Sequence, residues 1–143
     1  MLNQSADYAL RAVLYVAQAG ATRSCTAGVI AQAIGVPQNY LGKILNALTN
    51  AGVLTSIRGP RGGFRLARRA EDVTLSDVAS PFQRLPERRV CLLGDRPCHA
   101  ANPCVSHRKW QAMTDQVTAF FMSTTIAGML EGDVPEHVPT PTL

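Results

Sequence analysis

Three of the four cysteines lie within fourteen residues of one another, and a histidine follows them closely. Cys91, Cys98 and Cys104 are separated by six and five residues, and His107 comes three positions after the last of them. Thiolates and imidazole are soft ligands, and three thiolates with one further donor suit a [2Fe–2S] cluster, a [4Fe–4S] cluster or a zinc ion. Clustered cysteines in a cytoplasmic chain indicate metal or redox chemistry more often than disulfides. We therefore predict a metal or cluster site in this segment.

The identity of a fourth ligand is open at this point. His107 is one candidate, but it is equally expected as an exposed residue in the first turn of a helix, and His99 is a second candidate beside Cys98. A pairing of Cys98 with His107 as nucleophile and base would make an enzyme. Nothing in the sequence supplies an oxyanion site or a substrate pocket, so we do not expect an enzyme. Cys25, far from the others, is expected to be a small loop residue without a chemical role.

The two halves of the chain carry opposite net charges. Residues 1–70 contain eight basic residues and one acidic residue, whereas residues 71–143 contain six basic and nine acidic residues. A basic first half indicates a domain that binds a polyanion such as DNA, followed by a second functional part. No apolar run approaches the roughly 20 residues that cross a bilayer. Residues 1–5 do not have the pattern of a signal peptide, so we expect a cytoplasmic protein.

The first fifty residues have the periodicity of three short helices. Apolar residues recur at positions i, i+3, i+4 and i+7, and a glycine stands where each of the three helices would end. We expect helices at 5–19 with Ser5 as the N-cap, from Thr26 to Gly35, and from Pro37 to Gly52. The second and third helices, joined by a tight glycine turn, form a helix-turn-helix pattern.

A predicted β-hairpin follows the helix-turn-helix and reads as a wing. The strand-like runs 53–57 and 64–67 flank a glycine-rich turn, and Arg65, Arg68 and Arg69 follow it closely. Asparagine and glutamine pair with adenine in the major groove, and arginines on a slim turn suit a narrow minor groove. The predicted DNA contacts are Gln38, Asn39, Tyr40 and Lys43 of the third helix, and Arg58, Gly59, Pro60, Arg61 and Gly62 of the turn.

The second half is expected to contain a long helix and little other regular structure. We predict a short helix at 74–79, an irregular segment at 84–103, a long helix at 104–123 and a small helix at 126–130. Within the long helix, the spacing of a packing seam is found at Trp110, Met113, Val117, Phe120 and Thr124. The predicted division is a winged helix-turn-helix domain (1–80), a cysteine-containing sensor loop (81–103), a dimerisation helix (104–130) and a flexible tail (131–143). The fold class is mainly α with a small β-hairpin wing.

These stretches together resemble the Rrf-two (Rrf2) family of winged-helix transcriptional regulators. The matching residues are SADYALRAVLYVA at 5–17, IAQAIGVPQNYLGKILNALTNAGVLTSIRGPRGGFRLA at 30–67, and the cysteine segment with the long helix after it. The resemblance covers roughly residues 3–130. It implies a homodimer, joined through the long helix, that binds palindromic or semi-palindromic promoter DNA.

The resemblance also implies that Cys91, Cys98 and Cys104 ligate an iron–sulfur cluster. In the IscR-like branch the fourth ligand is a histidine that corresponds to His107, and in the NsrR-like branch it is an acid of the partner's first helix that corresponds to Asp7. The sequence retains both residues. The first two cysteines stand one residue further apart than is usual in the family, which leaves the cluster type and the fourth ligand open. The alternative is a winged-helix regulator without a cluster that senses through thiol oxidation or zinc.

Overall fold

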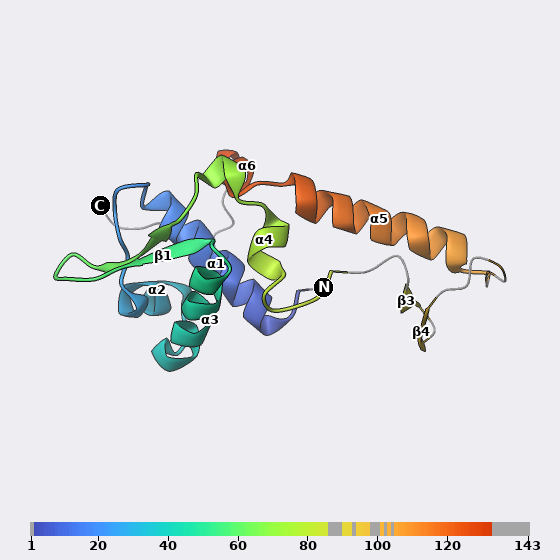
Figure 1. The fold of residues 1–143 in the computed structure, drawn as a ribbon, viewed down its shortest axis with the longest axis horizontal. Helices are drawn as coiled ribbons and strands as arrows, with labels where there is room; N and C mark the ends of the chain where they lie inside the picture. The colour runs from blue at the N-terminus through green and yellow to red at the C-terminus, as the bar shows by residue number, and fades with distance from the viewer. Residues whose placement is uncertain are drawn as a thin grey trace.

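The computed structural model describes residues 2–85, 90–92, 94–97, 101, 103 and 105–132, and of 90, 91 and 94–97 it describes the backbone alone. A winged helix-turn-helix body carries one long helix that extends away from it (Figure 1). The elements in chain order are α1 (Gln4–Gln18), α2 (Ala27–Ile34), α3 (Gln38–Asn50), β1 (Leu54–Ile57), β2 (Gly63–Leu66), η1 (Ala70–Asp72), α4 (Leu75–Ala79), β3 (Val90–Cys91), β4 (Gly94–Pro97), α5 (His107–Ser123) and α6 (Ile126–Glu131). The predicted fold class, mainly α with a β-hairpin wing, is confirmed.

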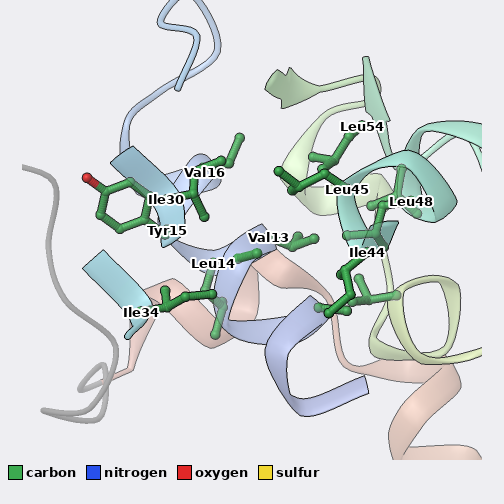
Figure 2. Packing of buried hydrophobic residues seen from close by; sticks show 14 of the residues in the cluster. Val13, Leu14, Tyr15, Val16, Ile30, Ile34, Ile44, Leu45, Leu48 and Leu54 are labelled. Atoms are coloured by element: carbon green, nitrogen blue, oxygen red, sulfur yellow. The ribbon is translucent and has the colours of Figure 1, made fainter. Parts of the chain in front are cut away.

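Helix α1 is the centre of the body, and α2, α3, α4, α6 and β2 all pack against it. Its apolar stripe is closed off from solvent, with Val13 and Val16 at most 1% exposed. Figure 2 shows these side chains meeting those of α2 and α3 in one cluster. Burying each leucine or isoleucine side chain of such a core stabilises the fold by roughly 1.5–3 kcal/mol. The apolar periodicity that predicted the helices therefore marks the residues that stabilise them.

In the body, both predicted ends of α2 are correct, whereas the predicted N-cap of α1 is wrong. Thr26 caps α2 by accepting from the backbone N of Val29, and Gly35 ends that helix in the left-handed conformation. Thr74 and Asp77 form a capping box at α4. Ser5 is not the N-cap of α1, because Asn3 takes that place and accepts from the backbone N of Ala6 at 2.8 Å.

The wing is a hairpin with an additional bridge. Strands β1 and β2 pair antiparallel, with Leu54 opposite Leu66 and Ile57 opposite Gly63. The chain between α1 and α2 joins them, since Cys25 exchanges two backbone hydrogen bonds with Phe64, at 2.9 and 2.7 Å. Cys25 is therefore a buried bridging residue of the wing. Burial raises the pKa of its thiol, although Arg23 opposes the effect.

The long C-terminal helix begins later than predicted, and the segment before it contains a strand pair that was not predicted. Helix α5 begins at His107, not near Cys104, and the irregular segment predicted at 84–103 contains the short antiparallel pair β3 and β4. The chain then returns to the body through α6. A bridge between Thr74 and Thr125 fixes this return, with Leu75 N donating to Thr124 O and Ile126 N to Val73 O. No helix in the described part of the chain is long and apolar enough to cross a membrane.

Candidate nucleic-acid interface and cysteine segment

Helix α3 presents one face to the core and the opposite face to solvent. The inner face is at most 2% exposed and consists of Leu41, Ile44, Leu45 and Leu48. The outer face carries Gln38, Asn39, Lys43, Asn46 and Asn50, all exposed. The apolar face fixes the helix against α1 and leaves a row of hydrogen-bonding side chains directed outward. A helix held in this way has the arrangement needed to enter the major groove.

The first turn of α3 is more constrained than its polar residues suggested. The Oδ1 atom of Asn39 accepts from the backbone N of Tyr40 at 2.9 Å, and the amide of Gln38 lies over Gly28 of α2. The Tyr40 hydroxyl is 2.7 Å from the Ser5 hydroxyl of α1, and the Tyr40 ring meets the Tyr8 ring edge-on, with centroids 5.9 Å apart. A carbonyl oxygen has two lone pairs, so Asn39 retains an acceptor position for a base.

Glycine shapes the turn of the wing and its attachment to the body. The turn residues Arg58, Gly59, Pro60 and Arg61 are exposed, and Gly59 has a φ of 108°. A β-carbon at Gly62 would lie 2.4 Å from the Ile57 carbonyl oxygen, and one at Gly63 would lie 2.4 Å from that of Cys25. Neither position has room for a side chain. The turn is consequently narrow, and its base is pressed against the chain before α2.

The arginines around the wing divide into two groups. Among the described residues, no ion pair involves Arg58, Arg61 or Arg65. Arg68 and Arg69 were expected to add positive charge close to the turn. They lie beyond β2 instead, and both form ion pairs with acidic residues. Arg68 is 3.3 Å from Asp77 and donates to the Asp72 carbonyl oxygen at 3.0 Å, and Arg69 is 3.3 Å from Glu71. Among the arginines around the wing, those without an ion pair in the described part of the chain are therefore Arg58, Arg61 and Arg65.

The pairing of Arg68 also acts on the capping box of α4. Burial favours the neutral form of Asp77, but hydrogen bonds from Thr74 and the charge of Arg68 outweigh it and lower the pKa of this carboxyl. The Asp77 carboxylate accepts from Thr74 N at 2.9 Å and lies beside the Arg68 guanidinium. Arg68 thus joins the end of the wing to the start of α4.

Two of the predicted cysteine ligands, Cys98 and Cys104, lie outside the described residues, as does His99. Cys91 is in β3, where the structure describes the backbone alone. His107 is the first residue of α5, and its exposed fraction is 9%. It is therefore buried, contrary to the alternative of an exposed first-turn residue.

The chain next to Cys91 lies near the start of α5, where His107 is also found. Leu92, next to Cys91, shares a hollow of about 410 Å³ with residues of the first turns of α5, including Lys109 and Trp110. His107 lines a neighbouring hollow of about 420 Å³ with Pro103, Val105, Arg108 and Lys109. Within the described ranges, no three His, Cys, Asp or Glu side chains gather as a metal site. The ligand set accordingly stays a prediction.

Asp7 lies in the first turn of α1, on the body. Its carboxylate pairs with Arg11 at 2.7 Å, and Arg11 lies over the Tyr8 ring, 4.9 Å from the centroid. Figure 1 shows α1 in the body, whereas α5 carries its first residue, His107, away from it. Asp7 and His107, the two candidate fourth ligands, therefore lie in different parts of the fold.

The predicted seam of α5 is largely open to solvent in the single chain. Met113 and Phe120 are 50% and 51% exposed, and Trp110 and Val117 are partly exposed. The adjacent stripe of His107, Thr114 and Phe121 is buried. An apolar row of this kind on a projecting helix is a surface suited to packing against a matching helix.

Comparisons with known proteins agree with this arrangement. The profile of the Rrf2 family, described as iron-dependent transcriptional regulators, matches residues 2–132. A chain of Aquifex aeolicus (strain VF5), whose name describes an HTH-type transcriptional regulator, is 33% identical over 132 residues, covering 91% of each chain. The structure of CymR, the global cysteine regulator of B. subtilis, has a TM-score of 0.78 at 24% identity, covering 92% of this chain and 96% of that one. T. potens IscR has a TM-score of 0.74 at 22% identity, covering 92% and 86%.

Proposed function

Because this chain belongs to the Rrf2 family of transcriptional regulators, we propose that it binds promoter DNA as a homodimer and that its affinity follows the state of a cysteine-ligated iron–sulfur cluster. Regulators of this family are not enzymes. The observation that carries the DNA-binding part is a narrow turn bearing Arg58 and Arg61, neither of which has an ion pair within the described residues, on a hairpin that follows a helix with an exposed polar face.

In this proposal the two elements have different tasks. The exposed residues of α3, Gln38, Asn39 and Lys43, read base edges in the major groove. The wing residues from Arg58 to Gly62 contact phosphates or a narrow minor groove, where positive charge is favoured. Glycine at 59 and 62 presents no side chain, so the backbone of the turn can approach the duplex closely. Gly62 has no room for a side chain within the turn.

A pair of matched variants tests the role of the wing. Arg61→Ala removes an unpaired charge at the turn, and Arg69→Ala removes a charge that is paired with Glu71. Both variants change the net charge equally. We expect Arg61→Ala to weaken DNA binding and to reduce the slope of log K against log salt by about 1. Arg69→Ala is expected to leave both nearly unchanged. Equal losses for the two variants would mean that only net charge matters and would contradict the docking of the wing.

We also propose a division of labour along the chain. Residues 1–80 form the DNA-binding domain, 81–103 the sensor loop, 104–130 the dimerisation element and 131–143 the tail. Two copies would meet through the open seam of α5, so that two recognition helices face successive turns of one duplex. The half-exposed Met113 and Phe120 support this role because a single chain leaves them uncovered.

The donor set fits an iron–sulfur cluster better than a purely structural site. Cys91, Cys98 and Cys104 would hold it, with His107 as the fourth ligand or Asp7 of the partner subunit as the alternative. Such a cluster, when bound, supplies a group whose charge and ligation change on oxidation or nitrosylation. The burial of His107 at the start of α5 supports it as a ligand, since a ring held in place is ready to ligate. The residues then act by holding the sensor loop against the dimer helix.

The absorption spectrum of protein purified without oxygen, with iron and sulfide analysis, tests the cluster. A coloured protein with matched iron and sulfide is the expected result, and His107→Ala and Asp7→Ala then identify the fourth ligand. A colourless protein that resists reconstitution would contradict the cluster. The regulator would in that case sense through thiol oxidation or zinc.

A further inference from the structure

The start of α1 and the start of α3 are joined by polar and aromatic contacts outside the apolar core. The Ser5 and Tyr40 hydroxyls lie 2.7 Å apart although the residues are 35 positions apart in sequence. Tyr8 packs edge-on against the Tyr40 ring, with an interplanar angle of 85°. Tyr8 is held in turn, because Gln4 donates to its hydroxyl at 3.0 Å and Arg11 covers its face. The Tyr40 side chain is therefore fixed at both its ring and its hydroxyl.

Tyr40 lies in the first turn of α3, beside the exposed residues Gln38 and Asn39. It directly follows Asn39, whose Oδ1 accepts from the Tyr40 backbone N. Pro37 caps the helix without a side-chain hydrogen bond, so the first turn lacks the usual polar anchor. The contact with Ser5 supplies that anchor from another element. A hollow of about 420 Å³ lined by Gln4, Tyr8, Pro37, Asn39 and Tyr40 leaves the first turn otherwise loosely packed.

We propose that Tyr40 is a positioning residue for base recognition, locked to α1 through the Ser5 hydroxyl, and not itself a contact to DNA. The inference rests on the proposed DNA-binding function and specifies how the reading end of α3 is held. Without the hydrogen bond to Ser5, the first turn of α3 samples more orientations, and the side chains of Gln38 and Asn39 are no longer held in one direction. Sequence discrimination falls as a result, because base contacts specify whereas phosphate contacts only position. The charge of the wing is untouched, so non-specific affinity and its salt dependence stay the same.

A double-mutant cycle on the full chain tests this proposal. The variants are Ser5→Ala, Tyr40→Phe and both together, with Thr49→Val as the control. Thr49 also has a hydroxyl and lies in the same helix, at the end opposite Tyr40. Its hydroxyl donates within the helix to Leu45 O at 2.8 Å. The probes are a duplex selected from a random library by the wild-type protein and a scrambled duplex of equal length. The ratio of the two affinities is measured along with the salt slope.

We expect each single variant to lower the specificity ratio about five- to tenfold, and the double variant to fall no further, because all three lose one hydrogen bond. Thr49→Val is expected to keep the wild-type ratio. A loss with Tyr40→Phe alone would identify a direct contact to DNA and overturn the proposal, as would unchanged ratios in all variants. If the wild type discriminates no sequence, the proposed function fails first. Hydrogen exchange at the first turn of α3 then separates failure of the proposed function from failure of the Tyr40 proposal. Faster exchange in Ser5→Ala supports the contact between Ser5 and Tyr40 independently of DNA.

Discussion

Replacing Gly63 by alanine tests how the wing is fixed to the rest of the domain. Gly63 has a φ of 139°, which L-residues rarely adopt, and its β-carbon would lie 2.4 Å from the Cys25 carbonyl oxygen. The colliding atoms are backbone, so no side chain can turn away to make room. The neighbouring Phe64 exchanges both of its bridging hydrogen bonds with Cys25, and the wing must separate from this segment to admit the methyl group.

The expected loss of stability has two parts. The unfavourable φ costs roughly 1–2 kcal/mol for an alanine. Weakening two backbone hydrogen bonds costs roughly another 1–3 kcal/mol, at 0.5–1.5 kcal/mol each. Gly20→Ala is a matched control, because Gly20 has a φ of 92° and nothing within 4 Å of its missing β-carbon. It should lose the conformational part alone, and the difference between the variants, about 2 kcal/mol, measures the bridge.

Urea unfolding at one fixed protein concentration measures both variants, since an oligomer's apparent stability depends on concentration. Gly63→Ala should also weaken DNA binding, because the wing arginines lose their fixed base. If the two variants agree within about 0.5 kcal/mol, the size of a neutral surface change, the bridge contributes nothing and the reasoning fails.

Three further outcomes are expected. The pKa of Asp77 is lowered in the folded state, so its carboxylate contributes fully to stability well above the unfolded pKa of about 3.9, and this contribution is lost as the pH falls through the lowered folded pKa. Urea unfolding at about pH 6 and about pH 2.5 should show a larger loss of stability for Asp77→Asn at the higher pH, and an equal loss at both would exclude an electrostatic origin. Met113→Glu should weaken a dimer about 100-fold or more by burying an unpaired charge. Met122→Glu, exposed on the other side of α5, should not, and sedimentation of both variants decides the role of the seam. Asn3→Ala removes the α1 cap and its contact to the Phe82 carbonyl oxygen, and should lower the midpoint of thermal unfolding through a loss of about 1 kcal/mol; an unchanged midpoint would refute the cap.

The helices of the body could be predicted because their determinants are local. The i, i+3, i+4, i+7 spacing of α3 corresponds to residues that are at most 2% exposed, and Gly35 adopts the left-handed conformation expected at a helix end. The hairpin turn was also identifiable from its glycines. Each of these features depends on neighbours a few positions away in the sequence.

The errors concern contacts between distant residues. Ser5 and Asn3 are equally good N-caps by type, but Asn3 is the cap, and the Ser5 hydroxyl lies 2.7 Å from that of Tyr40, a contact that periodicity does not reveal. The sequence places Arg68 next to the wing, whereas in the fold its guanidinium pairs with Asp77 of α4. The strands β3 and β4 are short and irregular, with a register shift between Val90 and Cys91, and so carry little alternation.

The bridge between Thr74 and Thr125 gives α5 the mechanics of a lever. The seventeen residues of α5 make a rod of about 25 Å, held near its last turn, with His107 at the far end. A tilt of about 5° at the held end would move the far end by about 2 Å, which is roughly ten times the tolerance of about 0.2 Å on a metal–ligand bond. A small rearrangement where α6 meets the body would therefore be magnified at His107.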